Sequence, residues 1–174
     1  ENNNNYSDYP TDICVHQLFS AQVENNPDKI AVVEPIEGNE IKQLTFKQLH
    51  TESLALAIYL QSLGVEPDSL VGLCVERSIG AMVGLMGILQ SGGAYVPMDP
   101  NYPTERLSFM LEDSRTRIVI TQPQFKDKVA SIVTPETVII VLDEQGCLAQ
   151  SIQEDMQMKA LSLDEKVASN NLAY

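Results

Sequence analysis

Short apolar runs in this chain alternate with longer segments in which apolar residues recur every three or four positions. The runs Leu70–Val75, Arg117–Thr121 and Thr137–Leu142 are bounded by turn-forming residues, which predicts strands that are buried on both faces. The segments between them have the 3.6-residue period of helices. Strands that alternate with helices predict an α/β fold with a mainly parallel sheet and flanking helices.

The N-terminal part predicts one helix followed by a β-hairpin. Asp12 can cap the helix, because its carboxylate can accept a bond from a free backbone amide, and Pro27 closes it. Ile30–Val33 and Ile41–Leu44 predict two strands that pair across a turn at Gly38.

Two further helices follow, and each has clear sequence signals. Thr45-Phe46-Lys47-Gln48 is a capping box, and the helix that it starts is expected to stop at Gly64 in a left-handed conformation. Ser78–Gln90 predicts a helix that contains three glycines, each of which costs about 1 kcal/mol relative to alanine. We expect these glycines to allow the helix backbone to pack closely on the sheet.

The glycine pair Gly92-Gly93 allows this helix to stop and reverse. Ala94–Val96 then predicts a short buried strand, and the prolines that follow it are expected to fix the exit loop outside any central strand position. Thr104–Asp113 predicts another helix, and a short helical or irregular piece is expected after Pro123.

The pattern weakens after Asp143, where polar residues dominate and only Leu161–Val167 has a helical spacing. The first eleven residues contain four consecutive asparagines and little that is apolar, so residues 1–11 are predicted to be an interdomain linker or tail.

The chain has 174 residues, with 11 basic and 24 acidic side chains and a formal charge of −13. This acidity argues against a nucleic acid or an anionic membrane as a partner, because both would be repelled. No signal peptide is present, and the longest apolar stretch, Ile79–Leu89, is too short to span a bilayer. A cytoplasmic location is therefore expected.

The three cysteines are far apart and lack the spacing of a disulfide framework or a zinc site. Cys74 lies within an apolar run and is predicted to be a buried small hydrophobic residue.

The sequence contains none of the common motifs that indicate a catalytic or nucleotide-binding activity. It has no phosphate-binding loop, no dinucleotide-binding glycine pattern and no nucleophile elbow. His16 and His50 lie in predicted helices without a partner that would mark a catalytic base. Glu52, Glu76 and Arg77 are isolated charges, for which a structural or solvated role is expected. Composition and spacing alone therefore predict a soluble α/β domain and no specific activity.

Leu89–Asp99 resembles a core motif of the amino-acid adenylation domains of nonribosomal peptide synthetases, with Gln90-Ser91 in place of the usual Lys-Ala. Leu44–Leu49 is similar to the first core motif of that family, with Phe46 where tyrosine is commoner. Asn170–Tyr174 resembles the first residues of the third core motif, the loop that holds the ATP phosphates.

Further matches occur in the same order at Tyr9-Pro10, His16–Phe19, Gln22-Val23, Pro27–Val32, Pro100–Leu107 and Phe109–Ser114. The resemblance covers nearly the whole chain after Thr11 and is weakest between Pro123 and Lys166.

The resemblance implies that residues 12–174 are the N-terminal segment of the large subdomain of an adenylate-forming enzyme, ending where the phosphate-binding loop begins. Such enzymes activate a carboxylate with ATP and Mg²⁺ and then transfer the acyl group to a thiol. In this family the groups that contact ATP, magnesium and the amino acid lie downstream of the position of Tyr174. We therefore predict no catalytic, cofactor-binding or metal-binding residue in this segment, which should be inactive and poorly soluble alone.

The implied partners are the remainder of the adenylation domain, on the same chain or a second one, an upstream condensation domain, and a downstream carrier protein with its phosphopantetheine thiol. Direct ligand contact by Tyr95, Asp99 or Arg106 is the weaker alternative to a purely structural role. Three other functions stay open: an acyl- or aryl-CoA ligase of the same superfamily, a non-catalytic docking module, and an independent doubly wound nucleotide-binding domain. The resemblance also implies that the residues that select the amino acid lie outside the segment.

Overall fold

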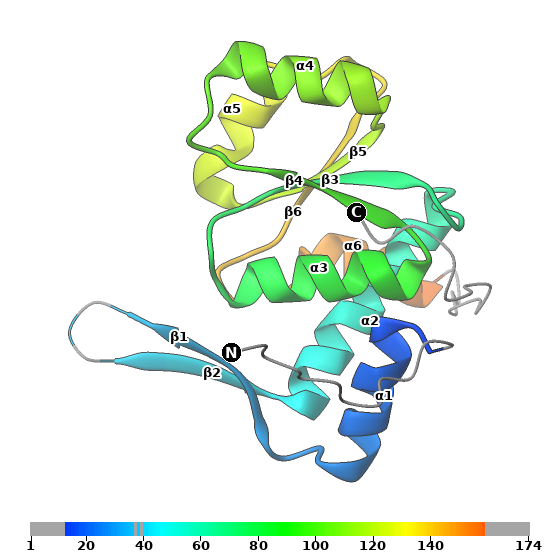
Figure 1. Ribbon diagram of the computed structural model, residues 1–174, viewed down its shortest axis with the longest axis vertical. Coiled ribbons are helices and arrows are strands. Elements are labelled where there is room, and N and C mark those ends of the chain that lie inside the picture. Colours follow the sequence, from blue (N-terminus) through cyan, green and yellow to red (C-terminus); the bar gives the residue numbers. More distant parts are fainter. Residues whose placement is uncertain (1–12, 37, 39, 159–174) are drawn as a thin grey trace, which may run out of the picture.

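The computed structural model describes residues 13–36, 38 and 40–158. Four strands form a parallel sheet in the order β4-β3-β5-β6, and two more form a separate antiparallel hairpin. Helices α4 and α5 lie on one face of the parallel sheet and α3 on the other, with α2 and α1 beyond α3 (Figure 1). The predicted α/β fold with a mainly parallel sheet and flanking helices is confirmed.

The bounds of the strands and helices are as follows. The strands are β1 (Ile30–Pro35), β2 (Ile41–Thr45), β3 (Leu70–Cys74), β4 (Ala94–Met98), β5 (Ile118–Thr121) and β6 (Val138–Val141). The helices are α1 (Val15–Asn25), α2 (Phe46–Ser62), α3 (Ile79–Ser91), α4 (Thr104–Ser114), η1 (Pro123–Phe125), α5 (Lys126–Ala130) and α6 (Gln150–Met158).

The start of α1 corrects one prediction. The residue at its N-cap is Cys14, not Asp12, which lies outside the described residues. The N–H of Cys14 donates to Gln17 Oε1 over 2.9 Å, so a glutamine in the first turn satisfies the amide of the cap residue. Pro27 follows the end of the helix, as predicted.

The capping box at the start of α2 is confirmed. The N–H of Gln48 donates to Thr45 Oγ1 over 3.2 Å, and Gln48 Oε1 accepts from the N–H of Thr45 over 2.9 Å. The helix is followed by Gly64 at φ +91°, the predicted left-handed stop. The hairpin of β1 and β2 is also confirmed, and β1 extends to Pro35, which pairs with Ile41.

Helix α3 lies between the sheet and α2, so its glycines serve different contacts. A β-carbon on Gly84 would lie 2.8 Å from Leu73 Cδ1 in the sheet, as expected for close packing there. A β-carbon on Gly87 would lie 2.6 Å from Leu56 Cδ2 in α2. The prediction that these glycines all pack on the sheet is therefore wrong for Gly87, because α3 has a neighbour on each side. It is also wrong for Gly80, whose β-carbon would lie 3.6 Å from the Asp143 carbonyl oxygen and from Gly146 Cα in the turn after β6.

The helix ends at Gly92, which has φ +94°, a value that non-glycine residues rarely adopt. Strand β4 then continues to Met98, two residues beyond the predicted end. Pro97 lies inside this strand and is tolerated because β4 is at the edge of the sheet.

The C-terminal part contains a helix that the sequence did not predict, α6. The weak helical pattern at Leu161–Val167 lies outside the described residues. The short helical piece after Pro123 is confirmed as η1 and α5.

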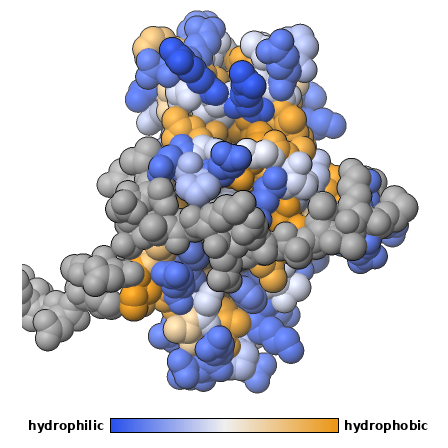
Figure 2. Space-filling view, turned by 90° about the vertical axis from the view of Figure 1, so that its right-hand side faces the viewer, coloured by the Kyte–Doolittle hydropathy of each residue, from blue (hydrophilic) through white to orange (hydrophobic). Residues whose placement is uncertain are grey.

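The hydrophobic core has two parts, one on each face of the parallel sheet. The larger part includes buried residues of α2, α3 and the strands, and Ile152 and Met156 of α6 pack against it. The smaller part lies under α4 and α5 and includes Cys74, which is fully buried as predicted. Figure 2 shows hydrophobic residues gathered at the level of the sheet, below the largely hydrophilic end of the molecule that carries α4. Among the helices that the structure describes, none has the length and hydropathy needed to traverse a bilayer.

Candidate functional site

A cleft of about 490 Å³ opens at the carboxyl ends of β3 and β4, the strand ends where α/β proteins bind ligands. Its floor is apolar, and its rim is polar and charged. The lining residues are Leu73, Val75, Glu76, Arg77, Pro97, Met98, Asp99, Pro100, Asn101 and Tyr102.

The crevice that such folds most often use lies where the strand order reverses, here between β3 and β5. The buried side chain of Gln122, directly after β5, spans this position. The N–H of Glu76 donates to Gln122 Oε1 over 2.9 Å, and Gln122 Nε2 donates to Ser78 Oγ over 2.8 Å. One glutamine thus bridges the two loops that would otherwise border an open crevice.

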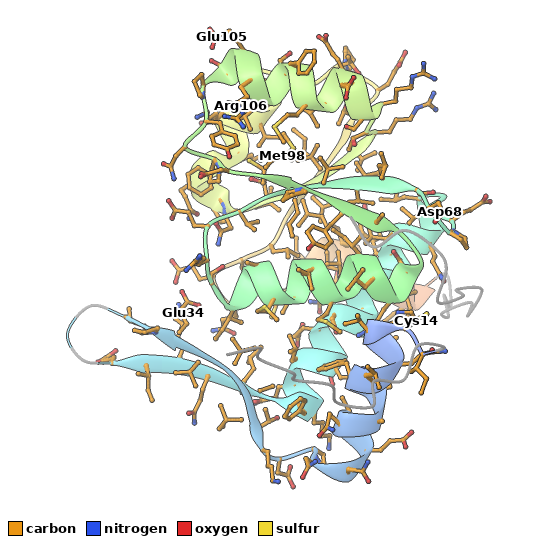
Figure 3. The ribbon with its side chains drawn as sticks, in the orientation of Figure 1. Cys14, Glu34, Asp68, Met98, Glu105 and Arg106 are labelled. Carbon is orange, nitrogen blue, oxygen red and sulfur yellow. The ribbon has the colours of Figure 1, made fainter. Side chains whose placement is uncertain are left out.

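The N-terminus of α3, beside this crevice, is occupied by side chains of the protein itself. Glu34 Oε2 of the hairpin accepts from the N–H of Ile79 over 2.7 Å, and Ser78 Oγ accepts from the N–H of Ala81 over 3.1 Å. Figure 3 shows Glu34 on the side of the hairpin that faces α3. Because free amides at a helix N-terminus attract anions, the Glu34 carboxylate takes the place that a phosphate would need. The place where the strand order reverses, between β3 and β5, is therefore filled by contacts among the β1–β2 hairpin, the start of α3 and the residue after β5. We call it the β3–β5 joint.

The opposite wall of the cleft, formed by residues 99–102, is held rigidly. The N–H of Asn101 donates to Asp99 Oδ1 over 2.8 Å, which closes a tight turn. Lys128 Nζ, from α5, donates to the carbonyl oxygens of Pro100 and Tyr102 over 2.6 and 2.8 Å. One ammonium group therefore ties this wall to α5.

Arg106 covers the outer side of the same wall. Its guanidinium carbon lies 3.8 Å from the centroid of the Tyr102 ring, a cation–π contact worth about 0.5–1 kcal/mol at an exposed site. Arg106 is labelled in Figure 3 near the start of α4. Its described contact is with the protein's own tyrosine.

The thiol of Cys74, at the end of β3, is buried and unreactive. Burial raises its pKa to about 11, the charge of Lys128 acts in the opposite direction, and the charge of Asp99 adds to the rise. A thiol with this pKa is protonated at neutral pH and is a poor nucleophile.

Only some of the candidate residues from the sequence line the cleft. Glu76, Arg77 and Asp99 line the cleft. Tyr95 instead packs half-buried against the larger core. The cleft therefore brings together two of the isolated charges, Glu76 and Arg77, with Asp99, but no histidine, cysteine or serine is among its lining residues.

The remaining candidates belong to helices on the far side of α3 from α4. His50 of α2 lies 6.0 Å, between ring centroids, from Phe19 of α1, and burial lowers its pKa. Burial raises the pKa of Cys147 to about 12, and the nearby carboxylates of Glu52 in α2 and of Asp143 add to the rise. His16 lies in α1. None of these residues lines the cleft.

No three His, Cys, Asp or Glu side chains are placed to hold a metal ion in the part of the chain that the structure describes.

Gln122 and Lys128, the two residues that organise the cleft, were missed by the sequence reasoning. Their contacts join positions 26 to 46 residues apart, and no local spacing marks them.

Comparison with protein families matches residues 19–174 to the family described as AMP-binding enzyme. A linear gramicidin synthase of Brevibacillus parabrevis is 50% identical over 122 residues, which is 70% of this chain and 2% of the relative. Bacitracin synthase 3 of Bacillus licheniformis is 38% identical over 172 residues, which is 99% of this chain and 2% of the relative. The chain thus spans only a few per cent of the length of these curated relatives.

A crystal structure of the nonribosomal peptide synthetase FmoA3, bound to α-methyl-L-serine-AMP, covers 97% of this chain with a TM-score of 0.75 and 25% identity. This chain corresponds to 17% of that structure. The N-terminal subdomain of Klebsiella oxytoca NpsA, at 21% identity and a TM-score of 0.63, has the same fold over 78% of the chain.

The family match covers the segments of the sequence resemblance from residue 19 onward, including Leu89–Asp99 with its glycine pair and the strand that follows. The resemblance to the adenylation domains of nonribosomal peptide synthetases is confirmed, and the chain belongs to the AMP-binding enzyme family.

Proposed function

We propose that this chain is the scaffold portion of an amino-acid adenylation domain of a nonribosomal peptide synthetase. The complete domain activates an amino acid with ATP to an aminoacyl-adenylate and loads it on the phosphopantetheine thiol of a carrier protein. The residues described above position the sheet and its loops, and the reacting groups are supplied by other parts of the domain.

The structure of the motif Leu89–Asp99 carries this proposal. Its residues form the end of α3, the left-handed Gly92, strand β4 and the first residue of the cleft wall. A β-carbon on Gly93 would lie 3.0 Å from Val65 Cγ1, so this position also serves close packing. A motif whose residues shape the backbone in this way supports a structural role for the segment.

The contacts between β3 and β5, where the strand order reverses, also support a structural role for this segment, with the reacting groups in other parts of the domain. The hydrogen-bonding groups of Gln122, Ser78 and Glu34 are used within the protein. The phosphate-contacting and carboxylate-contacting residues of the domain are accordingly expected outside residues 13–158, as the family resemblance implies. This remains a prediction.

In the complete domain, a carboxylate oxygen of the amino acid attacks the α-phosphorus of ATP. A new P–O bond forms, and the bond from the α-phosphorus to pyrophosphate breaks. The phosphopantetheine sulfur, as a thiolate, then attacks the acyl carbon, which forms a thioester and releases AMP. Backbone amides and cationic groups aimed at the transferring phosphoryl group would stabilise the developing charge, and Mg²⁺ would neutralise part of the triphosphate charge.

The proposed partners are the rest of the adenylation domain, a carrier protein and an upstream condensation domain. One structural neighbour is an artificial fusion of an adenylation domain with a PCP, NpsA-ThdA, at 21% identity. The second candidate activity is an acyl- or aryl-CoA ligase, since a fatty acid AMP ligase of Legionella pneumophila shares the fold at 19% identity and a TM-score of 0.63. The 50% identity to a linear gramicidin synthase favours the amino-acid branch.

Exchange of labelled pyrophosphate into ATP tests the proposal. We expect the complete domain to exchange only when its amino acid is present, and residues 1–174 alone to show no exchange with any amino acid. Exchange by residues 1–174 alone would contradict the scaffold assignment. Activation of fatty or aryl acids in place of amino acids by the complete domain would support the ligase alternative.

A further inference from the structure

Helix α1 is attached to the rest of the protein through the side chain of Phe19. The helix lies beside α2 at the outside of the molecule (Figure 1). All 11 residues of α1 are described by the structure, and none of them is buried. Phe19 is the residue of α1 that packs against the larger core. Because a helix this short is marginal without packing, its position depends on the contacts of this one ring.

The ring of Phe19 contacts two rings of α2, those of Phe46 and His50. The ring centroid of Phe19 lies 6.0 Å from that of Phe46, at an interplanar angle of 38°, and 6.0 Å from that of His50, at 49°. Phe46 and His50 are four positions apart on α2 and therefore share one face of that helix. The imidazole of His50 is thus part of the surface on which α1 rests.

The Nδ1 atom of His50 is suited to the neutral imidazole and not to the imidazolium. It is buried and has no hydrogen-bond partner in the part of the chain that the structure describes. The imidazolium carries a hydrogen on both ring nitrogens, so its Nδ1–H would need an acceptor or water. A buried charged donor without an acceptor is costly, and burial accordingly lowers the pKa of His50.

Water can reach His50 most easily by the departure of α1. On its other side α2 packs against α3, where Leu56 is fully buried and lies directly against Gly87. Separating α2 from α3 would therefore expose core residues. Moving α1 away exposes only half-buried and exposed side chains, since none of its own residues is buried.

Neighbouring charges do not set the state of His50. The elements that pack against α2 are α1, α3, β1 and β2, and α3 contains no titratable or charged residue. Glu34 of β1 accepts from the N–H of Ile79, and Lys42 of β2 pairs with Glu144 at 3.2 Å. Burial is the cause that lowers the pKa of His50. The remaining titratable groups on α1 and on α2 itself are His16, Glu24, Lys47, Glu52 and Tyr59.

We propose that His50 makes the attachment of α1 sensitive to pH: protonation of its imidazole favours a state in which α1 has moved away from α2 and water reaches the ring. The state with α1 detached binds the proton more tightly, because the ring is then hydrated. The detached fraction therefore rises as the pH falls through the histidine range. The body formed by α2, α3 and the parallel sheet stays folded. This device is independent of the reaction that the complete domain catalyses.

Hydrogen exchange followed by mass spectrometry tests the proposal in the complete domain. Protection factors at about pH 7.5 and about pH 5.5 are compared, each relative to an unstructured peptide at the same pH. We expect the amides of residues 19–23 in α1 to lose protection about threefold or more at the lower pH, and those of residues 83–89 in α3 to keep theirs. Unchanged protection of α1 would overturn the proposal. Equal losses in α1 and α3 would also overturn it, because they would show unfolding of the whole domain.

Two histidine variants assign the effect to a residue. His50→Gln cannot take up the proton, so its α1 protection should not differ between the two pH values. His16→Gln, at the other histidine of the chain, is the matched control and should keep the difference. Persistence of the difference in His50→Gln would overturn the proposal.

A measurement in the opposite direction does not depend on the His50 variant. Proton binding and detachment are linked, so removal of the Phe19 ring should make His50 easier to protonate. The titration of His50 is followed by exchange of its ring C–H hydrogen between the two nitrogens. In Phe19→Ala its midpoint should rise toward the ordinary value of 6.5, and in Val23→Ala, the control in the same helix, it should not move. Protection of α3 in the same samples checks that the body is folded, and an unchanged midpoint in folded Phe19→Ala would overturn the proposal.

Discussion

Gly87 of α3 lies directly against Leu56 of α2, so that a β-carbon on Gly87 would sit 2.6 Å from Leu56 Cδ2 and 3.0 Å from Leu56 Cβ. Real β-carbons essentially never lie this close to other heavy atoms. The contact would involve Leu56 Cβ, next to the backbone, as well as Cδ2 at the end of the side chain, so a change of rotamer alone would not relieve it. The two helices can approach this closely only because one of them lacks a side chain at this position.

Gly87→Ala is therefore expected to destabilise the protein. Overpacking of a tight core costs about 1–3 kcal/mol, which exceeds the gain of about 1 kcal/mol in helix propensity. Gly80→Ala is the matched control in the same helix, because its β-carbon would meet nothing closer than 3.6 Å. Urea unfolding should show a lower midpoint for Gly87→Ala and an equal or higher midpoint for Gly80→Ala. A stabilised Gly87→Ala variant would contradict the packing.

Gly92→Val is expected to impair folding and not to alter the binding of ATP selectively. Gly92 has φ +94°, and a β-branched residue held there costs about 1–3 kcal/mol. Gly92→Asn should be milder, since asparagine adopts left-handed conformations more readily. Melting temperature and the Michaelis constant for ATP of the complete domain are the two measurements. A Gly92→Val variant with normal melting and a raised Michaelis constant would refute the structural role.

The stability of the protein should fall as the pH falls through the histidine range. Burial lowers the pKa of His50 below its ordinary value of 6.5, so the unfolded chain binds the proton more tightly than the folded protein does. The resulting stabilisation is fully present above about pH 6.5 and is lost progressively below it. His50→Gln should reduce the difference in unfolding free energy measured at high and low pH. His16→Gln serves as the control, and an unchanged pH dependence in His50→Gln would contradict the assignment.

Lys128→Met is expected to loosen the wall of the cleft. The carbonyl oxygens of Pro100 and Tyr102 lose their common donor, and a buried group that loses its hydrogen bond costs about 1–3 kcal/mol. Hydrogen exchange should become faster at the amides of Asn101, Tyr102 and Thr104 in this variant. Lys126→Met, at an exposed position in the same helix, is the control. Equal exchange in the two variants would show that Lys128 does not hold the wall.

Local signals in the sequence were sufficient for most of the fold. Some elements are determined by residues that are close together in the sequence, so their positions could be predicted from spacing. Examples are the Thr45 capping box, the left-handed Gly64 and Gly92, and the apolar strands. The prediction errors occurred where the local structure depends on contacts between residues that are far apart in the sequence. Helix α6 is polar apart from residues such as Ile152 and Met156, and these are helical because they pack on a core formed by other segments.

The candidate site was harder to predict for the same reason. The joint between β3 and β5 depends on Gln122, a residue with no motif around it, which contacts positions more than forty residues earlier. The inward orientation of Glu34 follows from its contact with Ile79 across 45 positions of sequence. Sequence patterns could place these residues on elements, but could not show which elements they would join.

Pro97 limits the directions in which the sheet can be enlarged. The N–H of Ala94 points toward β3, where it donates to the carbonyl oxygen of Ser69 over 2.8 Å, so by the alternation along a strand the nitrogen of Pro97 points away from the sheet. That nitrogen carries no hydrogen, and the free border of β4 therefore lacks a donor needed for another strand. Val138–Val141, on the opposite border, contains no proline. Any strand recruited to widen this sheet is thus directed to the β6 side.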